Sequence, residues 1–583
     1  MPFALGGFRF PLGPDAPVYL WWIRLAGVDG LSAVGHRPGA PALALAAGGA
    51  FGLSDVQIVT ALEGALGVAT GMASAALLRA GGARRLVWVL GGLLAGTFAV
   101  HLAAGYLANL AFAVAFLAAA ALLAAGTRRS AVGAAVVLGA GGLAHPLFFL
   151  VGGAVLLLSA AFAWRRDRAE ALRIGGAALG AGAIVGVGLL ALLPGPRPLE
   201  VDTSKDAFLR RAGLTGELRA AYFDRFVHRW ARYVQWASVP LAIAGIRPAE
   251  GFLGRFLRAW GLVTIVGIAV SLATGIAPAD RFVTFGFVVP LLASLGLARL
   301  WDRLRARRAV AVVATGVLAA AMLAGAWIAW NRQDPFMSPL EVARVTDAGL
   351  FVSGAAPDTA LVFTVNDDDP EVTFLATRAA NVIRAAVPPD RIRDVVVLVP
   401  PLDGPDVPPV RGALARLSLA DAEAATAARN GRRVDVLLAP FDRVDLAEAT
   451  APGSAWHRVN RGVFLTPDAI DAIGRPSTFD PLRPSSPSGI ALATLATFAL
   501  LAVTGYGWSR TAISDAGNAG ALSLAFGAAA ITIVAIALER LGVPLSGTAG
   551  PIAVSALSGG SGYLAWFVLE RRAGSHPAPQ VEE

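Results

Sequence analysis

The sequence contains no cysteine and almost no lysine, and both absences limit what the protein can do. Without cysteine there are no disulfides, no thiolate metal ligands and no cysteine nucleophile. Of the 49 lysine and arginine residues only Lys205 is a lysine, which we interpret as coding bias rather than function. Charged residues of all kinds make up only 15% of the chain. So little charge is untypical of a soluble globular protein and favours a membrane protein.

Apolar residues dominate instead: they make up 56% of the 583 positions, and the mean hydropathy is +0.63. A helix needs about 20 apolar residues to cross roughly 30 Å of hydrocarbon. The sequence contains about 13 runs near this length, separated mostly by short loops. We predict membrane spans at 56–79, 85–104, 108–126, 131–144, 146–164, 174–193, 231–247, 258–276, 282–300, 309–330, 488–508, 518–538 and 549–570. The shorter apolar run 38–53 is predicted to be a re-entrant or interfacial helix.

The positions of the arginines predict how the spans are oriented. A net charge of +9 could suggest nucleic-acid binding, but the arginines form short clusters between apolar runs, where the positive-inside bias would place them. Clusters follow nearly every odd-numbered span; Arg128 and Arg129, for example, follow the third. We therefore predict a multi-pass protein of the cell membrane, with its N-terminus outside and its C-terminus in the cytoplasm.

This orientation conflicts with the start of the sequence. An outward N-terminus requires a signal peptide or a preceding helix, and residues 1–12 lack the basic and apolar regions of a signal. We therefore expect that a first helix is missing from this sequence. Two alternatives remain open: the short tail crosses the membrane unaided, or 38–53 spans after all and moves Asp15 away from the outer face.

The only long polar stretch, 331–487, is predicted to lie outside as an α/β domain. It contains three expected strands, at 360–365, 394–399 and 434–438, with a helix at 371–386 between the first two. Strands that alternate with helices suggest a small parallel sheet. The predicted organisation is a first extracytoplasmic loop with interfacial helices (1–55), a transmembrane bundle (56–330), this α/β domain (331–487), three C-terminal spans (488–570) and a cytoplasmic tail (571–583).

Polar residues at the outer ends of the spans are the candidates for chemistry, because ionisable groups near a bilayer are costly and usually functional. Asp15 lies between Pro14 and Pro17 in the first loop and could act as a general base. Tyr19, Trp21 and Trp22 follow it, and such aromatic residues concentrate at membrane interfaces. The alternative is an ordinary aspartate in a turn.

Arginines on the outer side could bind a phosphate group in bidentate fashion. Arg281 precedes the ninth span, and Arg210 and Arg211 lie in the long loop before the seventh. A turn with Asp280, or contact with lipid headgroups, is the alternative for Arg281. Further residues that could line the same cavity are Tyr19, Asp29, His36, Arg37, His101, Tyr106 and His145.

No metal site is predicted from these residues. Two histidines at the same depth, His101 and His145, suggest metal or proton handling, but no further ligand stands at a recognisable spacing. Each could equally be an interfacial hydrogen-bonding residue. The acidic run 366–371 could bind a divalent cation such as Mg²⁺ or Mn²⁺, or could simply begin a helix with favourable charge.

Several weak motifs occur in a characteristic order: 14–19 around Asp15, then 36–43, 105–111, 144–147 and 280–282. In this order the chain resembles the GT-C superfamily of integral-membrane glycosyltransferases, which use polyprenyl-phosphate-linked sugars. The resemblance covers about residues 8–330 and implies a GT-C-like bundle with a soluble outer domain. It implies that Asp15 is the catalytic base and that Arg281 contacts the lipid phosphate. The first loop lacks the paired Asp-x-Asp of the oligosaccharyltransferase branch, so metal-dependent chemistry is not implied.

The implied reaction is an inverting sugar transfer from the polyprenyl-phosphate donor to a cell-envelope glycan, lipid or protein. Two other classes remain possible from the sequence. A transporter or flippase of lipid-linked glycans should show an internal repeat and charged or broken helices near the midplane. No clear repeat is present, and Glu63 is the main charge within the spans. A non-catalytic envelope subunit with a degenerate GT-C core is the third hypothesis.

Overall fold

The computed structural model describes most of the helical regions and only parts of the region between 332 and 484. The described residues are 10, 15–35, 37–102, 105–192, 238–246, 251–274, 280–331, 339, 342–343, 346, 360–364, 381–398, 434–438, 452–453, 457–460, 463–465 and 485–574. His36, Arg210, Arg211 and the acidic run 366–371 lie outside these residues, as does most of the helix expected at 371–386.

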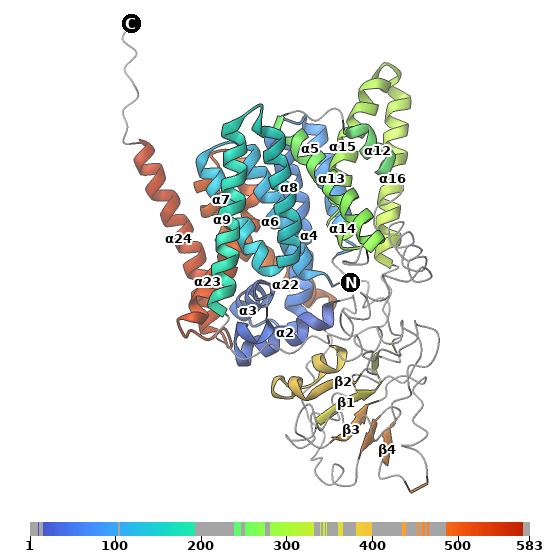
Figure 1. Ribbon diagram of the computed structural model, residues 1–583, viewed down its shortest axis with the longest axis vertical. Coiled ribbons are helices and arrows are strands. Elements are labelled where there is room, and N and C mark those ends of the chain that lie inside the picture. The colour runs from blue at the N-terminus through green and yellow to red at the C-terminus, as the bar shows by residue number, and fades with distance from the viewer. Residues whose placement is uncertain are drawn as a thin grey trace.

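Long helices packed side by side form the main body of the molecule (Figure 1). In chain order they are α4 (Asp55–Ala80), α5 (Arg85–Ala99), α6 (Leu107–Ala124), α7 (Arg128–Ala144), α8 (Pro146–Trp164), α9 (Arg168–Leu192), α12 (Ser238–Gly245), α13 (Gly251–Thr274), α14 (Asp280–Thr284), α15 (Val288–Leu304), α16 (Arg308–Asn331), α22 (Pro487–Ala512), α23 (Ala516–Arg540) and α24 (Ala549–Gly574).

Within the described part of the chain, eight of these helices are long and apolar enough to cross a membrane: α4, α6, α8, α9, α13, α22, α23 and α24. A helical, multi-pass membrane protein is therefore confirmed at this level. Each of the remaining predicted spans overlaps a helix. Three of these helices are short, with 15 residues in α5, 17 in α7 and 8 in α12, whereas α16 is continuous over 24 residues. The ninth is interrupted, because a turn at Phe285–Phe287 separates α14 from α15. The count of about 13 spans thus stays a prediction.

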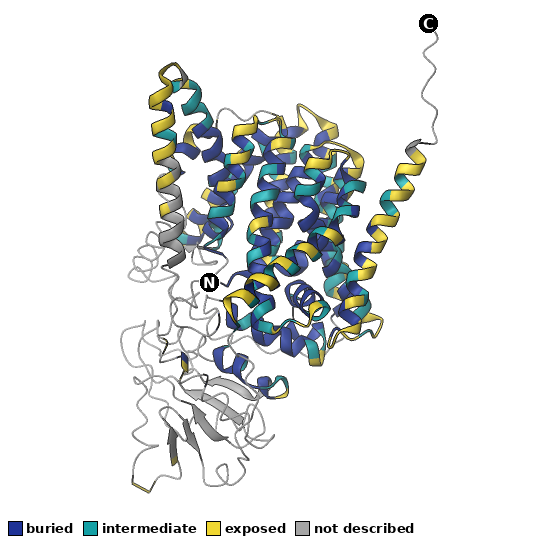
Figure 2. Ribbon diagram, turned by 180° about the vertical axis from the view of Figure 1, so that it is seen from behind, coloured by how far each residue is buried: buried dark blue, intermediate teal, exposed yellow. Residues whose placement is uncertain are grey.

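The helices differ widely in how much of their surface other helices cover. Of the 18-residue apolar stretch in each helix, 89% is buried in α6 and only 17% in α24. Exposed residues accordingly run along the whole of α24 (Figure 2), including Leu564 and Phe567. In a membrane protein such a face lies against lipid, and a helix buried on every side lies at the centre of the bundle.

Aromatic rings fill the space between α6, α8 and α13. Phe116 of α6 has its ring centroid 5.0 Å from that of Trp260 and 5.1 Å from that of Phe285, and Phe148 is 5.4 Å from Phe285. All four side chains are fully buried. The turn between α14 and α15 is therefore held in the core of the bundle by its phenylalanine.

Polar residues determine where several helices begin. Ser54 forms a capping box with Gln57 at the start of α4, and Thr127 forms one with Ser130 at the start of α7. Each box satisfies backbone N–H groups that have no partner within the helix. These signals explain why both helices begin where a polar residue interrupts the apolar sequence.

Two short helices lie across the end of the bundle that faces the strands (Figure 1). They are α2 (Ala16–Asp29) and α3 (Gly39–Phe51), joined by the 3₁₀ helix η1 (Leu31–Val34). At 1.5 Å per residue the 13 residues of α3 extend about 20 Å, less than the roughly 30 Å of a hydrocarbon core. This length suits a re-entrant or interfacial helix, and its place relative to a membrane stays a prediction.

In the described part of the chain, five strands form one mixed sheet with the order β2-β1-β3-β5-β4. The strands are β1 (Ala360–Thr364), β2 (Val395–Leu398), β3 (Val434–Leu438), β4 (His457–Asn460) and β5 (Val463–Leu465). The first three lie at the positions predicted from the sequence, and β1 is parallel to both β2 and β3. The expectation of a wholly parallel sheet is wrong, because β5 pairs antiparallel with both β3 and β4.

Candidate functional site

The structure places Asp15 at the start of a helix and not within a loop. Asp15 is the N-cap of α2, and its carbonyl oxygen accepts a hydrogen bond of 3.1 Å from the backbone N–H of Tyr19. Pro17 stands in the first turn, where its missing N–H costs nothing. The carboxyl group makes no capping hydrogen bond to the helix, so it remains available for other chemistry.

Tyr19 lies one turn after Asp15 and joins α2 to the bundle. Its side chain is buried, and its hydroxyl oxygen accepts a hydrogen bond of 3.2 Å from the backbone N–H of Ala108. Ala108 belongs to the first turn of α6, where backbone N–H groups lack partners within the helix. The tyrosine therefore fixes the beginning of α2 against the beginning of α6.

Charged groups from three separate parts of the chain act on the Tyr19 hydroxyl. Burial raises the pKa of Tyr19, and the negative charge of Asp15 raises it further, while Arg37 and Arg281 act in the opposite direction. Electrostatic effects of this kind fall off with distance, so Asp15, Arg37 and Arg281 each lie within electrostatic range of the Tyr19 hydroxyl. All four residues were selected by the sequence analysis. We call Asp15, Tyr19, Arg37 and Arg281 the Tyr19 cluster.

Arg37 and Arg281 reach this cluster from different elements. Arg37 lies between η1 and α3, and its buried Nε atom has no hydrogen-bond partner in the structure as described. Arg281 lies on α14, where its carbonyl oxygen accepts a hydrogen bond of 2.9 Å from the Thr284 hydroxyl. As whole residues, both arginines are partly exposed. Guanidinium groups can bind a phosphate and a carboxylate can accept a proton, so the cluster contains both kinds of group.

Asn109 stands in the same outer turn as Tyr106 but was not among the selected site residues. It follows Ala108 in the first turn of α6 and is only 1% exposed. Neither polar atom of its side-chain amide has a hydrogen-bond partner among the described residues. Leaving a buried polar group unpaired costs about 1–3 kcal/mol, so the amide of Asn109 is a candidate for binding another group. Its position beside Tyr106 in a predicted outer turn was the only signal in the sequence.

Both histidines use Nδ1 for local backbone contacts. His145 is the N-cap of α8, and its Nδ1 accepts a hydrogen bond of 3.2 Å from the backbone N–H of Phe148. A neutral His145 ring must then carry its proton on Nε2. His101 has the opposite arrangement, because its Nδ1 faces the carbonyl oxygen of Phe98 and must donate. These contacts favour the hydrogen-bonding interpretation of each histidine.

The remaining candidates lie in different places. Tyr106 is the buried N-cap of α6, so it belongs to the same turn as Asn109. Asp29 is exposed at the far end of the 14-residue helix α2, about 20 Å along the axis from Asp15. It is therefore not part of the Tyr19 cluster. Trp21 and Trp22 are only 5% and 9% exposed, so they pack inside the protein and not at its surface.

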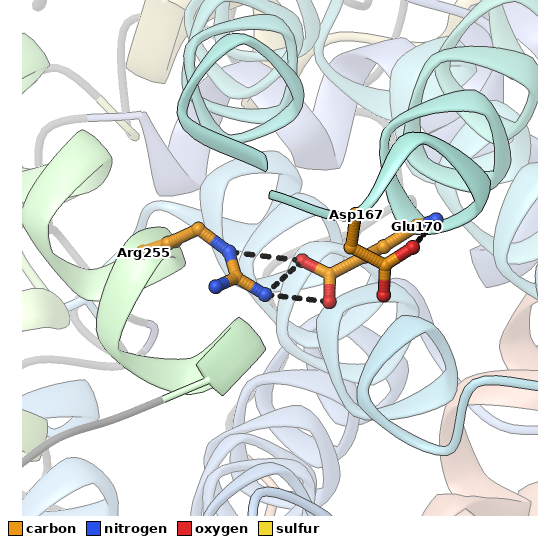
Figure 3. A network of polar contacts seen from close by, with 3 residues as sticks. All are labelled: Asp167, Glu170 and Arg255. Atoms are coloured by element: carbon orange, nitrogen blue, oxygen red, sulfur yellow. Dashed lines mark hydrogen bonds and ion pairs between the residues drawn. The ribbon is translucent and has the colours of Figure 1, made fainter. Parts of the chain in front are cut away.

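No group of three or more histidines, aspartates or glutamates that could hold a metal ion occurs in the described residues. Among the described residues, Arg255 near the start of α13 makes three hydrogen bonds to Glu170 near the start of α9 (Figure 3). Both helices begin at the end of the bundle opposite α2 (Figure 1). Both carboxylate oxygens of Glu170 are 2.6 Å from Nη2 of Arg255, and the Glu170 N–H donates to Asp167. This network holds two helices together and has the character of a structural contact.

Comparison with protein-family models, with curated proteins and with solved structures found no match to this chain.

Proposed function

We propose that the protein is a membrane glycosyltransferase of the GT-C type, which transfers a sugar from a polyprenyl-phosphate donor to an acceptor on the outer face of the cell membrane. The observation that carries this proposal is the Tyr19 cluster. It combines one carboxylate with two guanidinium groups at the end of an apolar helix bundle. A lipid-linked donor needs both an apolar surface for its chain and cations for its phosphate.

Each residue of the cluster has a role in the proposed reaction. The oxygen of an acceptor hydroxyl attacks the anomeric carbon while Asp15 takes the proton of that hydroxyl. The bond between the anomeric carbon and the phosphate oxygen breaks, and the polyprenyl phosphate leaves with the electron pair. Arg281 and Arg37 stabilise the negative charge on the leaving phosphate. A single displacement of this kind inverts the anomeric centre.

The arrangement of the helices supports an outward location for this site. Arg84, Arg129, Arg166, Arg308 and Arg571 are all exposed, and all lie near the helix ends opposite α2 and α3. The positive-inside bias assigns that end to the cytoplasm. We therefore propose about 13 spans, with the Tyr19 cluster and an extracytoplasmic α/β domain built on the sheet at the outer end.

The test is sugar transfer by the purified protein in liposomes, with a panel of polyprenyl-phosphate-linked sugars as donors. Asp15→Asn should lower the transfer rate about 10²- to 10⁴-fold, because it removes the base and keeps its shape. Asp29→Asn, on the same helix, is the matched control and should transfer at the wild-type rate.

Two results would contradict the proposal. If the folded wild-type protein transfers no sugar from any donor, a non-catalytic subunit or a transporter is the better description. If Asp15→Asn transfers as fast as the wild type, the protein is an enzyme with a different base.

A further inference from the structure

Helix α2, which begins after Asp15 and carries Tyr19, is buried on all sides along its middle. Ten of its fourteen residues are buried, and eight of them are consecutive from Tyr19 to Ala26. A helix that only lay on the end of the bundle would expose one face to solvent or lipid headgroups. Another element must therefore cover the outer face of α2.

The element that covers α2 is the segment 381–394, which we call the clamp. Its first six residues are helical, and they are followed by the 3₁₀ helix η3 (Pro389–Asp394), which packs against α2. Val382, Ile383 and Ile392 are fully buried or nearly so and belong to the same apolar cluster as Trp21 and Trp22. The clamp leads directly into β2, so it connects the sheet to α2.

Trp21 of α2 makes two specific contacts with the clamp. Its indole Nε1 donates a hydrogen bond of 3.2 Å to Oδ1 of Asn381. The guanidinium carbon of Arg384 lies 5.5 Å from the centre of its ring, within the range of a cation–π interaction. Both contacts depend on orientation, so they define one position of α2 relative to the clamp.

Arg24, one turn further along α2, joins three elements. This arginine is only 7% exposed. Its Nε lies 2.6 Å from Oδ2 of Asp55 at the start of α4, and its Nη1 donates to the carbonyl oxygen of Ala385 in the clamp. A buried guanidinium needs all such partners, so α2, α4 and the clamp must keep this arrangement together.

The contacts continue from the clamp to the Tyr19 cluster through a row of aromatic rings. The ring centres of Trp21 and Trp22 are 5.8 Å apart, and those of Trp22 and Tyr19 are 5.7 Å apart, both edge to face. Closely packed rings transmit a displacement because the interior has no space to absorb it. A shift of the clamp would therefore move Tyr19 and, with it, the first turn of α2.

We infer that the clamp positions the active-site helix: the sheet region holds α2 through Asn381, Arg384 and Ala385 and so fixes Asp15 relative to Arg37 and Arg281. Trp21 and Arg24 are positioning residues, since they act on the site through α2. The effect of the clamp on catalysis rests on the proposed function, but its hold on α2 does not.

Hydrogen–deuterium exchange of the α2 backbone measures this hold without any assay of activity. Asn381→Ala removes the acceptor for the Trp21 N–H and should lower the protection of α2 about fivefold, the effect of one net hydrogen bond. Asn381→Asp keeps an acceptor oxygen and should retain protection. Trp21→Phe combined with Asn381→Ala should have no greater effect than the larger single substitution, because both remove the same bond.

The chain offers matched controls at a distant contact between α22 and α24. Trp508 donates its indole N–H to the carbonyl oxygen of Ser558 at 2.8 Å, and Arg510 lies 5.5 Å from the ring centre of Trp566. Trp508→Phe and Arg510→Gln should lower the protection of α24 and leave α2 unchanged. If Asn381→Ala and Arg384→Gln leave the protection of α2 unchanged, the inference is wrong.

Kinetics separate this inference from the proposed function. Arg37 and Arg281 lie outside α2, so Asn381→Ala should lower kcat for sugar transfer about fivefold and leave the KM for the donor unchanged. Loss of α2 protection with an unchanged kcat would contradict a positioning role. Loss of α2 protection in a protein whose wild type transfers no sugar would support the clamp and refute the proposed function.

Discussion

Several arginines at one end of the helix bundle are exposed, whereas some at the other end are buried. At the end where the chain passes from α6 to α7 and from α8 to α9, Arg128, Arg129, Arg165 and Arg166 are all exposed. At the end that carries α2, Arg24 is 7% exposed, and Arg391 of the neighbouring clamp is 3% exposed. Exposed arginines beside the spans determine orientation, whereas buried arginines must have partners or bind something.

Two ion pairs illustrate the difference. Arg24 and Asp55 have side chains that are 5% and 32% exposed, while Arg84 and Asp302, at the other end, are 73% and 34% exposed. Both pairs are in direct contact. A short distance between two charged groups therefore does not by itself show whether the pair is structural or merely lies on the surface. Burial separates the arginines that orient the protein from those, such as Arg24, that hold its elements together.

The largest predicted difference between the ends concerns catalysis. Arg281→Gln should lower the rate of sugar transfer about 10²- to 10³-fold, because a lost cation leaves the charge on the departing phosphate without stabilisation. The control is Arg303→Gln, which removes an exposed arginine near the end of α15 and should leave the rate unchanged. Equal losses in both variants would mean that the arginines act through net charge only.

The second prediction concerns stability. Arg24→Met should lower the free energy of unfolding by about 3 kcal/mol, the lower end of the range for a broken buried pair, since Asp55 is 32% exposed. Equilibrium unfolding in mixed micelles measures this difference. Arg84→Gln should have no measurable effect.

Replacement of both partners sharpens this prediction. Arg24→Met with Asp55→Leu should recover most of the lost stability, because no charge then remains buried without a partner. If the double variant is as unstable as Arg24→Met, the loss comes from packing and not from the charge.

The smallest predicted effect is the loss of a helix cap, which should be similar at both ends of the bundle. Ser54→Ala at the start of α4 and Thr127→Ala at the start of α7 should each cost about 1 kcal/mol, because each removes the oxygen that caps the helix. The same unfolding measurement applies to both. A much larger loss at Ser54 would mean that this residue also contributes to the fold around α2.

Much of the helical architecture can be predicted from hydropathy. The run predicted at 518–538 is α23 (Ala516–Arg540), and the run at 56–79 is α4 (Asp55–Ala80), because long apolar runs have no other way to satisfy their backbone in a membrane. The strand β1 agrees equally well with its predicted position. Interfacial helices were predicted within residues 1–55, but the segment after Asp15 was interpreted as a loop. The bounds and burial of α2 were not predicted, because its aromatic residues show no helical period.

The candidate site could be predicted only in part from the sequence. Asp15, Arg37 and Arg281 could be selected by residue type and position, and the charge of each acts on the pKa of Tyr19. The burial of Trp21 could not be predicted, because its partner Asn381 is 360 residues away. Contacts between such distant segments depend on the packing of the whole chain, which one sequence does not reveal.

The central claim is that the end carrying α2 faces outward and holds the active site. The natural absence of cysteine allows a direct test with a reagent that labels thiols but does not cross membranes. Ser546 and Ser514 are exposed, and they lie in the loops at the two ends of α23. Ser546→Cys should be labelled in intact cells, and Ser514→Cys only after the membrane is permeabilised. Labelling of Ser514→Cys but not of Ser546→Cys in intact cells would contradict the claim.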